Sequence, residues 1–583
     1  MGKRRNRSKH RTAQGAVGST ANWTTGELRS YQVGAMPIIN HLLERMNAEE
    51  IVQSHLPRED GRTTIPCGRQ ILLLVRNFLV SREPLYGIGE WASRYAPDLL
   101  GLTPAQVGLL NDDRLGRCLK KFFSSDPPAI AVLVTTHCVR RFQVCLDELH
   151  NDSTTITFYG AYATAQREGQ RGGRPTPAIT FGHNKDHRPD LKQLLYVLTL
   201  SQDGAVPVHF RICSGNVQDD QTHRETWDFL HHLAGHADFL YVADCKLATM
   251  ENMTYIHGHG GRFVTVLPRT RKEDDQFRSR LAAGAVTWDL LWEKENSTGL
   301  VVDRFSIDHV PTLTTEGYRL IWYHSTRKAE LDAAIRANTI RRGLLELEGL
   351  RAKLQGPRTR YRDAAKVREA IEEILDRQGI AGFVRVTVEE TCVEKFRQDH
   401  RGRPGSNTRY IRQESHRFDL PYEMDHQQVE AAERLDGAFP LVTNDRQLSE
   451  LELLHAYKRQ PLIEKRFEQL KTDFAIAPVW LNNVDRIDAL LGVYYLALLT
   501  EALLERELRQ AMKRAGLESL PLYPEGRPCR CPTVRRLIDL FDPIQRHEID
   551  QRGQPPVVMV TELTPLQRRL LRLLGIDPST YGR

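Results

Sequence analysis

The chain of 583 residues is long enough for a large apolar core and for about two to four domains. Its 81 lysines and arginines against 74 acids leave a net charge of only +7, which is weak evidence for a polyanionic partner. The nine cysteines are scattered and form no disulfide framework, no apolar run is long enough to span a membrane, and no signal peptide is found, so we expect a cytoplasmic protein.

The first 125 residues divide into a basic tail and a helical segment. Residues 1–26 are expected to form a flexible tail, whose six basic side chains within 1–11 suit either phosphate binding or simple solubility. In residues 27–125 apolar side chains recur at helical intervals, through 38–46 and again through 71–79. We expect a helical amino-terminal domain that binds DNA ends, with purely structural helices as an equal alternative, because no helix-turn-helix can be assigned.

Between residues 140 and 270 the pattern changes to short apolar and β-branched runs. Their predicted order is strand, hairpin with an Asp-Gly turn at 203–204, helix, buried strand and strand: 155–159, 194–200, 206–213, 221–233, 239–243 and 262–267. This order is that of a ribonuclease H-like domain, a mixed sheet packed with helices, so the predicted fold class is α/β with a ribonuclease H-like catalytic core.

A large insertion is predicted to interrupt this core. Residues 271–438 are expected to form an inserted α+β subdomain, with strands near 318–323 and 383–388 and helices at 328–354 and 364–375. The core resumes at 439–515, where a helical region carries Glu464. Residues 516–583 are expected to form a carboxy-terminal helical tail.

The resumed core contains two stripes of side chains. Tyr457, Gln460, Glu464 and Lys471 fall in one stripe on a helix, and the apolar stripe beside it contains Ile463, Phe467, Leu470 and Phe474. A capping box predicts that the helix begins at Ser449, and Pro461 either kinks it or begins a second helix. Taken alone, this segment is most simply an ordinary amphipathic helix with its charges in water.

Three acids are distinguished by their positions. Asp152 lies beside the first strand, Asp244 directly follows the buried strand 239–243, and Glu464 lies on the helix after the insertion. In a ribonuclease H-like fold these places meet at one edge of the sheet, where carboxylates repel one another unless cations neutralise them. Oxygen ligands select Mg²⁺ or Mn²⁺, and two such ions serve phosphoryl transfer. For each acid alone, a capping or surface role is the commoner explanation.

With these residues in place, the chain resembles bacterial insertion-sequence transposases of the DDE type, in the group with a tyrosine-arginine-glutamate-lysine (YREK) signature. That signature has two, three and six residues between its members. Tyr457, Gln460, Glu464 and Lys471 match it at three of four positions with the correct spacing. Further segments similar to this group cover nearly the whole chain: Gly182 to Gln193, Gly215 to Thr222, Asp436 to Asp445, Pro84 to Tyr86 and Asn111 to Arg117.

The resemblance implies a transposase that cuts at the terminal inverted repeats of an insertion sequence and joins the 3′-hydroxyls to target DNA. It implies Asp152, Asp244 and Glu464 as catalytic, metal-binding residues, with Mg²⁺ as the cofactor and Mn²⁺ as a substitute. Double-stranded DNA would be the partner, and the chain would act as a homodimer in a synaptic complex. Two alternatives remain open: a nuclease of the same fold without strand transfer, and an inactive or domesticated copy that only binds DNA.

The same resemblance implies residues that hold DNA near the cut. Tyr457 and Lys471 would position phosphates. Gln460 departs from the signature because it lacks the charge of arginine, so that contact is either missing or supplied by Arg459. The segment Gly182 to Gln193 is expected to form an exposed loop that offers its basic side chains to DNA, namely Lys185, Arg188 and Lys192. A supporting part of the catalytic site and a simple solvated turn are the alternatives.

Overall fold

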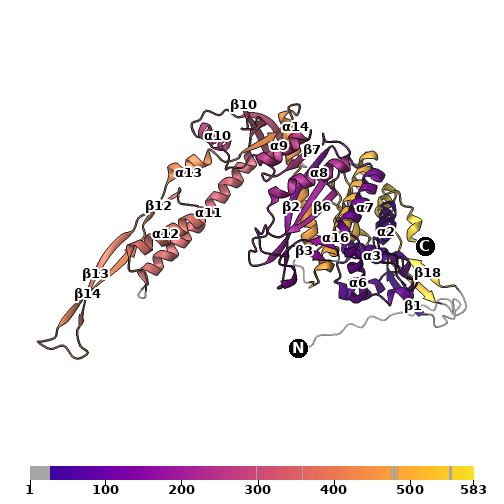
Figure 1. Cartoon of the computed structure of the whole chain (residues 1–583), viewed down its shortest axis with the longest axis horizontal. Coiled ribbons are helices and arrows are strands. Elements are labelled where there is room, and N and C mark those ends of the chain that lie inside the picture. The colour runs from indigo at the N-terminus through magenta and orange to yellow at the C-terminus, as the bar shows by residue number, and fades with distance from the viewer. Residues whose placement is uncertain are drawn as a thin grey trace, which may run out of the picture.

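A computed structural model describes most of the chain, namely residues 27–171, 173–296, 299–356, 359–474, 476, 481, 483–550 and 555–582. The expected basic tail, residues 1–26, lies outside these ranges. The molecule is a mixed α/β body from which one long arm projects, to the left in Figure 1. The amino- and carboxy-terminal segments lie together on the body at the opposite end from the arm.

Nine strands form one large mixed sheet in the body, in the order β6-β5-β2-β7-β8-β16-β11-β10-β9. β2 pairs with β5 in antiparallel and with β7 in parallel orientation, and β7 pairs with β8 in parallel. The remaining pairings are antiparallel. The strands are β2 (Glu148–Phe158), β5 (Lys192–Ser201), β6 (Val206–Ser214), β7 (Leu240–Ala243), β8 (Arg262–Val266), β9 (Asp289–Glu295), β10 (Val301–Leu313), β11 (Arg319–Ser325) and β16 (Ala438–Thr443).

All five strands predicted between 155 and 267 are present, and their order along the chain is confirmed. β2 begins seven residues earlier than expected, at Glu148, because its first half is mostly charged and polar, which is not typical of a buried strand. The Asp-Gly turn joins β5 to β6, with Gly204 at φ 82° as such a turn requires. Asp152 therefore lies within β2 rather than beside it.

Both faces of the central strands are covered, which explains the continuous apolar run of β7. Tyr241 and Ala243 face the core that holds Trp227 of α8 (His223–Ala234) and Ile256 of α9 (Met250–Gly258). On the opposite face, Leu240 and Val242 pack with Leu453 and Leu454 of α14 (Glu450–Lys458). Because both faces of such a strand are buried, apolar side chains occupy successive positions and do not alternate with polar ones.

The amino-terminal helices do not form a core of their own. They pack around the central helix α16 (Val484–Arg514), and one apolar cluster contains both these helices and the sheet. The predicted helices at 38–46 and 71–79 are α1 and α3. The amino-terminal helices are α1 (Met36–Arg45), α2 (Ala48–Ser54), α3 (Cys67–Val80), α4 (Ile88–Ser93), α5 (Pro104–Val107), α6 (Asp112–Ser124) and α7 (Pro127–Phe142).

α16 is the one helix in the described ranges that is long and apolar enough, by length and composition, to cross a membrane. Its most apolar window is 94% buried inside the structure. That burial is typical of the central helix of a packed core.

The carboxy-terminal segment, expected to be helical only, also contains strands. Two helices, α17 (Val534–Phe541) and α18 (Pro565–Leu573), accompany β17 (Gln545–Asp550) and β18 (Val557–Val560). β17 pairs with β1 (Glu27–Gln32), so the two ends of the described chain share one small sheet. The expectation missed these strands because β17 is largely charged and β18 is only four residues long.

The segment 271–438, expected as one insertion, serves two parts of the molecule. After α10 (Lys272–Ala282), strands β9 to β11 extend the central sheet. The following residues form the arm, which has its own apolar core with Leu347, Ile371 and Phe418. The arm consists of α11 (Thr326–Gln355), α12 (Ala364–Gln378), β12 (Val384–Val386), β13 (Glu389–Gln398), β14 (Tyr410–Asp419), β15 (Tyr422–Met424) and α13 (His426–Glu433). A further small hairpin joins β3 (Gly169–Arg171) to β4 (Arg174–Thr176) on the body.

Candidate active site

Asp152 and Asp244 lie side by side at one point of the sheet. The parallel register pairs Asn151 of β2 with Ala243 of β7, and each of these residues is followed by one of the two aspartates. Asp244 directly follows β7, and its carboxylate accepts the backbone N–H of Lys246 at 3.0 Å. Asp152 accepts the N–H of Ser153 at 2.7 Å. The first two acids of the predicted triad are thus neighbours in space.

Glu464 lies on the second of two helices that follow β16. The capping box at Ser449 is present and begins α14. Pro461 begins a second helix, α15 (Pro461–Glu468), so the helix break is confirmed. The apolar stripe with Ile463 and Phe467 is buried, while the carboxylate of Glu464 is exposed and makes no ion pair with any residue that the structure describes.

A chain of polar contacts fixes the junction of α14 and α15 against β2. Arg459 pairs with both oxygens of Glu148 at 2.6 and 2.5 Å, and Glu148 bonds Nε2 of His150 at 2.8 Å. Gln460 bonds Nδ1 of His150 at 3.0 Å and donates its amide N–H to the carbonyl of Asn151 at 3.1 Å. This chain of contacts ends one residue before Asp152, so it sets where the Glu464 helix lies relative to the aspartates.

These contacts change the interpretation of Arg459 and Gln460. Both were expected to contact DNA. Gln460 is only 8% exposed and both ends of its amide are bonded within the chain, while the Arg459 guanidinium is neutralised by Glu148. We therefore assign both residues a positioning role. Burial alone would raise the pKa of Glu148, but the hydrogen bonds from His150 and Arg459 outweigh it and lower that pKa.

Tyr457 lies on the last turn of α14 and is partly buried. Burial raises the pKa of its hydroxyl to about 12, and the carboxylates of Asp244, Glu464 and Asp152 add to the rise. The hydroxyl therefore stays protonated and can donate a hydrogen bond at neutral pH. All three predicted acids lie within electrostatic reach of this one group.

Lys185 lies among the carboxylates. Its ammonium group is 2.9 Å from Asp219 and 3.4 Å from Asp152, and it donates to the carbonyl and hydroxyl of Ser153 at 2.7 and 2.8 Å. Asp219 begins the short turn before α8 and faces the site from a fourth segment of chain. Lys185 thus neutralises two of the clustered acids.

Burial and the neighbouring charges perturb the pKa values of both aspartates. Burial raises the pKa of Asp152 to about 6; Lys185 opposes the rise and Asp244 adds to it. Burial likewise raises the pKa of Asp244. Such carboxylates gain from a nearby cation, and oxygen-only donors suit Mg²⁺ or Mn²⁺. In the described part of the chain, however, no group of three His, Cys, Asp or Glu side chains is already arranged to hold a metal ion.

The loop from Gly182 to Gln193 is held in place by its own interior. The amide of buried Asn184 accepts the N–H groups of Asp186 and Arg188 and donates to Gln193. Gly182 lies so close to Gly215 that an added Cβ would be 1.9 Å from the Gly215 carbonyl oxygen. Only glycine fits there, which explains why the loop begins with this residue.

The other basic residues predicted to bind DNA lie around the carboxylates rather than among them. Lys471 pairs with Asp186 at 2.7 Å on the outer side of the loop. Arg188 pairs with Asp190 at 2.7 Å and lies over the Tyr159 ring. Lys192 donates to the Ala161 carbonyl and lies over Phe181. Of these three side chains, Arg188 is exposed, whereas Lys192 and Lys471 are half-buried.

Sequence reasoning missed three polar residues of this site. Glu148 and His150 precede Asp152 at alternate positions of β2, so all three share one face of the strand. That two-residue period is the signal that could have found them. Asp219 was noticed only as part of a motif, because nothing in its local sequence indicates which of Asp219 and Asp220 faces the lysine.

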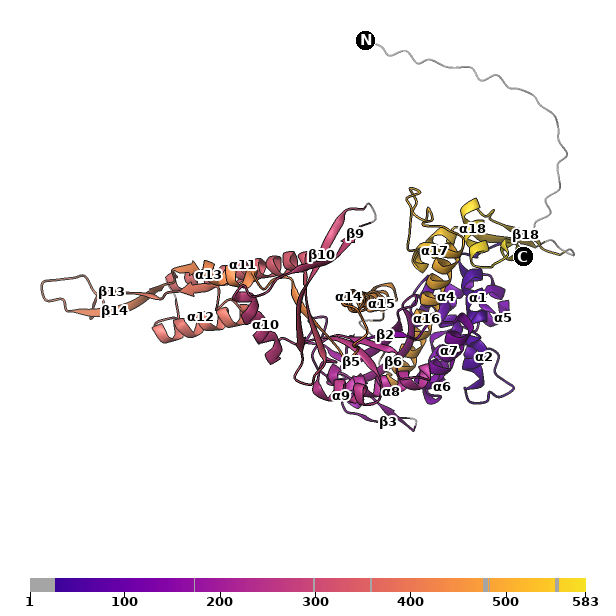
Figure 2. The same cartoon turned by 90° about the horizontal axis from the view of Figure 1, so that it is seen from above.

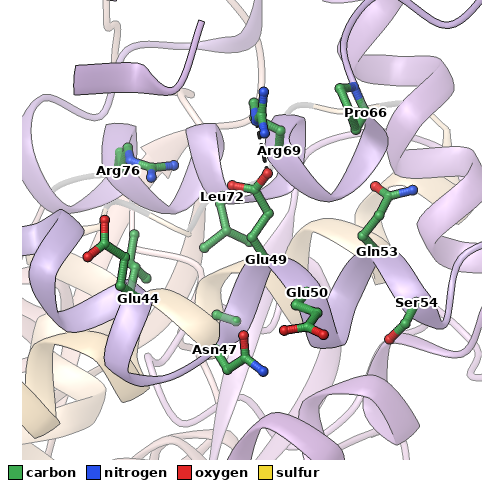
Figure 3. Close-up of a pocket in the computed structure, with 12 residues that line it drawn as sticks. Glu44, Asn47, Glu49, Glu50, Gln53, Ser54, Pro66, Arg69, Leu72 and Arg76 are labelled. Atoms are coloured by element: carbon green, nitrogen blue, oxygen red, sulfur yellow. Dashed lines mark hydrogen bonds and ion pairs between the residues drawn. The ribbon is translucent and has the colours of Figure 1, made fainter. Parts of the chain in front are cut away.

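A separate cavity lies among the amino-terminal helices. It measures about 620 Å³, and its walls carry Glu44, Glu49 and Glu50 opposite Arg69 and Arg76; Glu49 pairs with Arg69 at 2.9 Å (Figure 3). Three carboxylates make this surface unfavourable for DNA phosphates.

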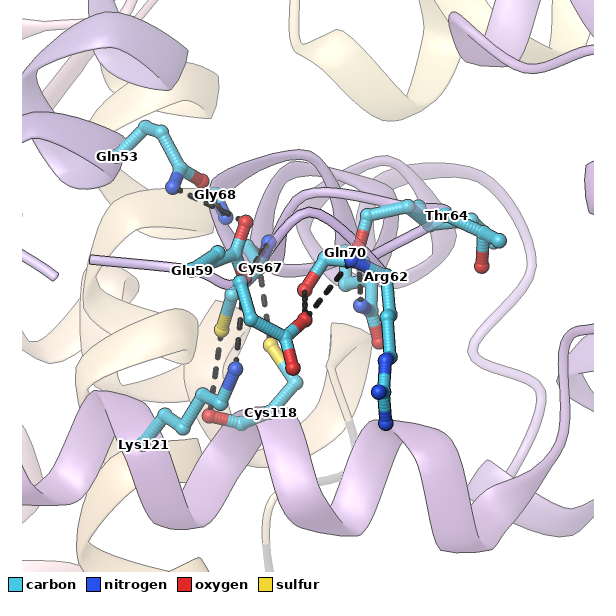
Figure 4. A network of polar contacts seen from close by, with 12 residues as sticks. Gln53, Glu59, Arg62, Thr64, Cys67, Gly68, Gln70, Cys118 and Lys121 are labelled. Atoms are coloured by element: carbon cyan, nitrogen blue, oxygen red, sulfur yellow. Dashed lines mark hydrogen bonds and ion pairs between the residues drawn. The ribbon is translucent and has the colours of Figure 1, made fainter. Parts of the chain in front are cut away.

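The amino terminus of α3, next to this cavity, is also occupied by the protein's own side chains. Glu59 accepts the N–H of Cys67 at 3.1 Å and Gln53 accepts that of Gly68 at 2.7 Å (Figure 4). Lys121 lies 3.6 Å from Glu59. Two of the N–H groups that could bind an anion at this helix start are therefore bonded to the protein's own side chains.

Comparisons with known proteins leave the family open. Residues 28–135, the helices around this cavity, match a family model described as "Domain of unknown function (DUF4277)". No curated protein matches the chain. A solved structure with some similarity is the piggyBac transposase synaptic complex with hairpin DNA. The two are 7% identical, 93% of this chain and 82% of that chain are covered, and the TM-score of 0.35 is too low to carry an argument.

Proposed function

We propose that the chain is a DDE transposase that cuts DNA at the ends of its own element and transfers the 3′-hydroxyl strands to target DNA. The observation that carries the proposal is the adjacency of Asp152 and Asp244, which follow the paired residues Asn151 and Ala243 of two neighbouring parallel strands. Glu464, exposed on α15, is the proposed third acid. The strand order β6-β5-β2-β7-β8, with its first parallel pair at the two aspartates, supports a ribonuclease H-like core.

In this proposal Asp152, Asp244 and Glu464 hold Mg²⁺, which Mn²⁺ can replace. When bound, the metal supplies activation of the attacking oxygen and charge stabilisation in phosphoryl transfer. Lys185 competes with a divalent cation for Asp152, because its ammonium already pairs with that carboxylate. Tyr457 donates a hydrogen bond to a phosphate oxygen, and Lys471, Arg188 and Lys192 hold the DNA backbone beside the site.

Duplex DNA is the proposed partner, and a homodimer would hold two ends together. The DNA flanking the gene supplies the direct test. We expect matched inverted repeats, and incubation of the purified protein with a fragment carrying them and Mg²⁺ should release 3′-hydroxyl ends that then join a second DNA. Cutting without joining would favour a nuclease, and binding without cutting would favour an inactive copy.

A further inference from the structure

The arm places a β-hairpin far from the carboxylates. α11 has 30 residues, and the base of the hairpin is tied to it where Arg351 pairs with Asp419 at 2.6 Å. The two strands, of 10 residues each, then continue beyond the end of the helix, as Figures 1 and 2 show. At 1.5 Å per residue for the helix and about 3.3 Å for the strands, the tip lies roughly 70 Å from the sheet.

Charge is strongly divided along this hairpin. Its base carries Glu389, Glu390, Glu394 and Glu414. Its tip, residues 395–412, carries six lysine or arginine side chains against one aspartate. The whole chain has a net charge of only +7, so this tip is a local concentration of positive charge rather than a sample of the average surface.

Cations along the arm differ in whether a carboxylate neutralises them. On the shaft, Arg336 pairs with Asp436 at 2.7 Å, and Arg351 pairs with Asp419. At the tip, five exposed cations form no ion pair with any carboxylate in the ranges that the structure describes: Lys395, Arg397, Arg401, Arg403 and Arg409. Unneutralised cations crowded on one hairpin repel one another, so the fold itself gains nothing from them.

Exposed aromatic and apolar side chains lie among these cations. Phe396, Tyr410 and Ile411 are 65%, 52% and 55% exposed. The register places Phe396 opposite Arg412 and Tyr410 opposite Gln398, so both rings are on one face of the ribbon. An isolated hairpin is only marginally stable in water, and a two-stranded ribbon of this kind fits the major groove of B-form DNA.

We propose that the hairpin tip, residues 395–412, is a second DNA-binding surface that grips the backbone of duplex DNA roughly 70 Å, or about 20 base pairs, from the central sheet. The inference rests on the proposed function only in taking duplex DNA as the substrate. The five unpaired cations bind phosphates, and the exposed rings lie against the groove.

The test neutralises three tip arginines together, in R401Q/R403Q/R409Q. The matched control, R342Q/K366Q/R368Q, removes three exposed charges on α11 and α12 that also lack ion pairs with described residues. Binding to a fluorescein-labelled 60-base-pair duplex of arbitrary sequence is followed by anisotropy between 50 and 200 mM NaCl. The slope of log K against log salt is negative, and it should become shallower by about 0.9 for each phosphate that the variant no longer neutralises, or about 2.7 in all. The control variant should retain the wild-type slope.

Three outcomes show whether the hairpin tip binds DNA or a second copy of the chain. An unchanged slope and affinity in the tip variant overturns the proposal. So does an unchanged DNA affinity accompanied by an altered sedimentation coefficient without DNA, because the tip would then bind a second copy of the chain. Assaying cleavage beside binding separates the two proposals. If wild type binds through the tip but never cuts DNA, the catalytic proposal fails alone. If the tip variant cuts and binds DNA as wild type does, the proposal for the tip fails alone.

Discussion

Replacing Lys185 by methionine tests whether the carboxylate cluster is a cation site. The substitution keeps the length of the side chain and removes the ammonium that lies 2.9 Å from Asp219 and 3.4 Å from Asp152. At an effective dielectric constant of about 20, each such pair attracts by about 5 kcal/mol. The side chain of Lys185 is 29% exposed, so solvent screening and desolvation offset most of this energy. The net loss of stability without metal should be about 1–3 kcal/mol.

The same variant should bind Mg²⁺ more tightly, because the metal no longer competes with a resident cation. We expect about a tenfold gain in affinity, which adds about 1.4 kcal/mol of metal-dependent stabilisation at saturating Mg²⁺. Thermal unfolding across an Mg²⁺ series measures both effects. Lys192→Met is the matched control, since Lys192 belongs to the same loop but contacts Ala161 and Phe181 instead of the acids. Weaker or equal stabilisation of Lys185→Met by Mg²⁺ would refute this account.

Three further predictions concern the support of the site and the core. Gln460→Ala leaves the buried Nδ1 of His150 and carbonyl of Asn151 without a hydrogen-bond partner, so it should lower the free energy of unfolding by about 1–3 kcal/mol. It should also lower the rate of DNA cleavage more than the affinity for DNA. Equal losses of rate and affinity would argue against a positioning role for Gln460. In Gly182→Ala the added Cβ would clash with the Gly215 carbonyl oxygen, so the loop of residues 182–193 should be destabilised. We expect faster amide hydrogen exchange in these residues. Unchanged exchange would contradict the close approach of Gly182 to Gly215. Burial and the neighbouring Glu505 raise the pKa of Glu501 to about 8, so between about pH 5 and 8 the folded chain keeps a proton that the unfolded chain has lost, and wild-type stability should fall as the pH rises through this range. In thermal melts, the stability of Glu501→Gln relative to wild type should increase over the same range. A difference in stability that does not change with pH would count against the raised pKa.

The parts of the fold that follow from local sequence were predictable. The Asp-Gly turn between β5 and β6, the capping box at Ser449 and the helix start at Pro461 are each determined by a few neighbouring residues, and each is present. The doubly buried strand β7 could be recognised because covering both faces leaves an uninterrupted apolar run.

The parts that depend on distant partners could not be predicted in the same way. β17 is held by pairing with β1, more than 500 residues earlier in the chain, and its own sequence is polar. Glu148 and His150 stabilise the site through Arg459 and Gln460, which lie about 310 residues later in the sequence, after the whole of the arm. The direction of the Lys185 side chain depends on Asp219, and no spacing in the sequence encodes that contact.

The proposed catalysis is tested most directly by single substitutions of the three acids. Asp152→Asn, Asp244→Asn and Glu464→Gln remove one charge each while nearly preserving shape. Cleavage of a fragment carrying the inverted repeats from beside the gene should be measured with Mg²⁺, together with binding of the same fragment. The account predicts that each variant binds the fragment as wild type does and cuts it at least about a hundredfold more slowly. Cleavage at the wild-type rate by any one of the three would contradict the assignment of that acid, and wild-type cleavage by all three would contradict the proposed active site.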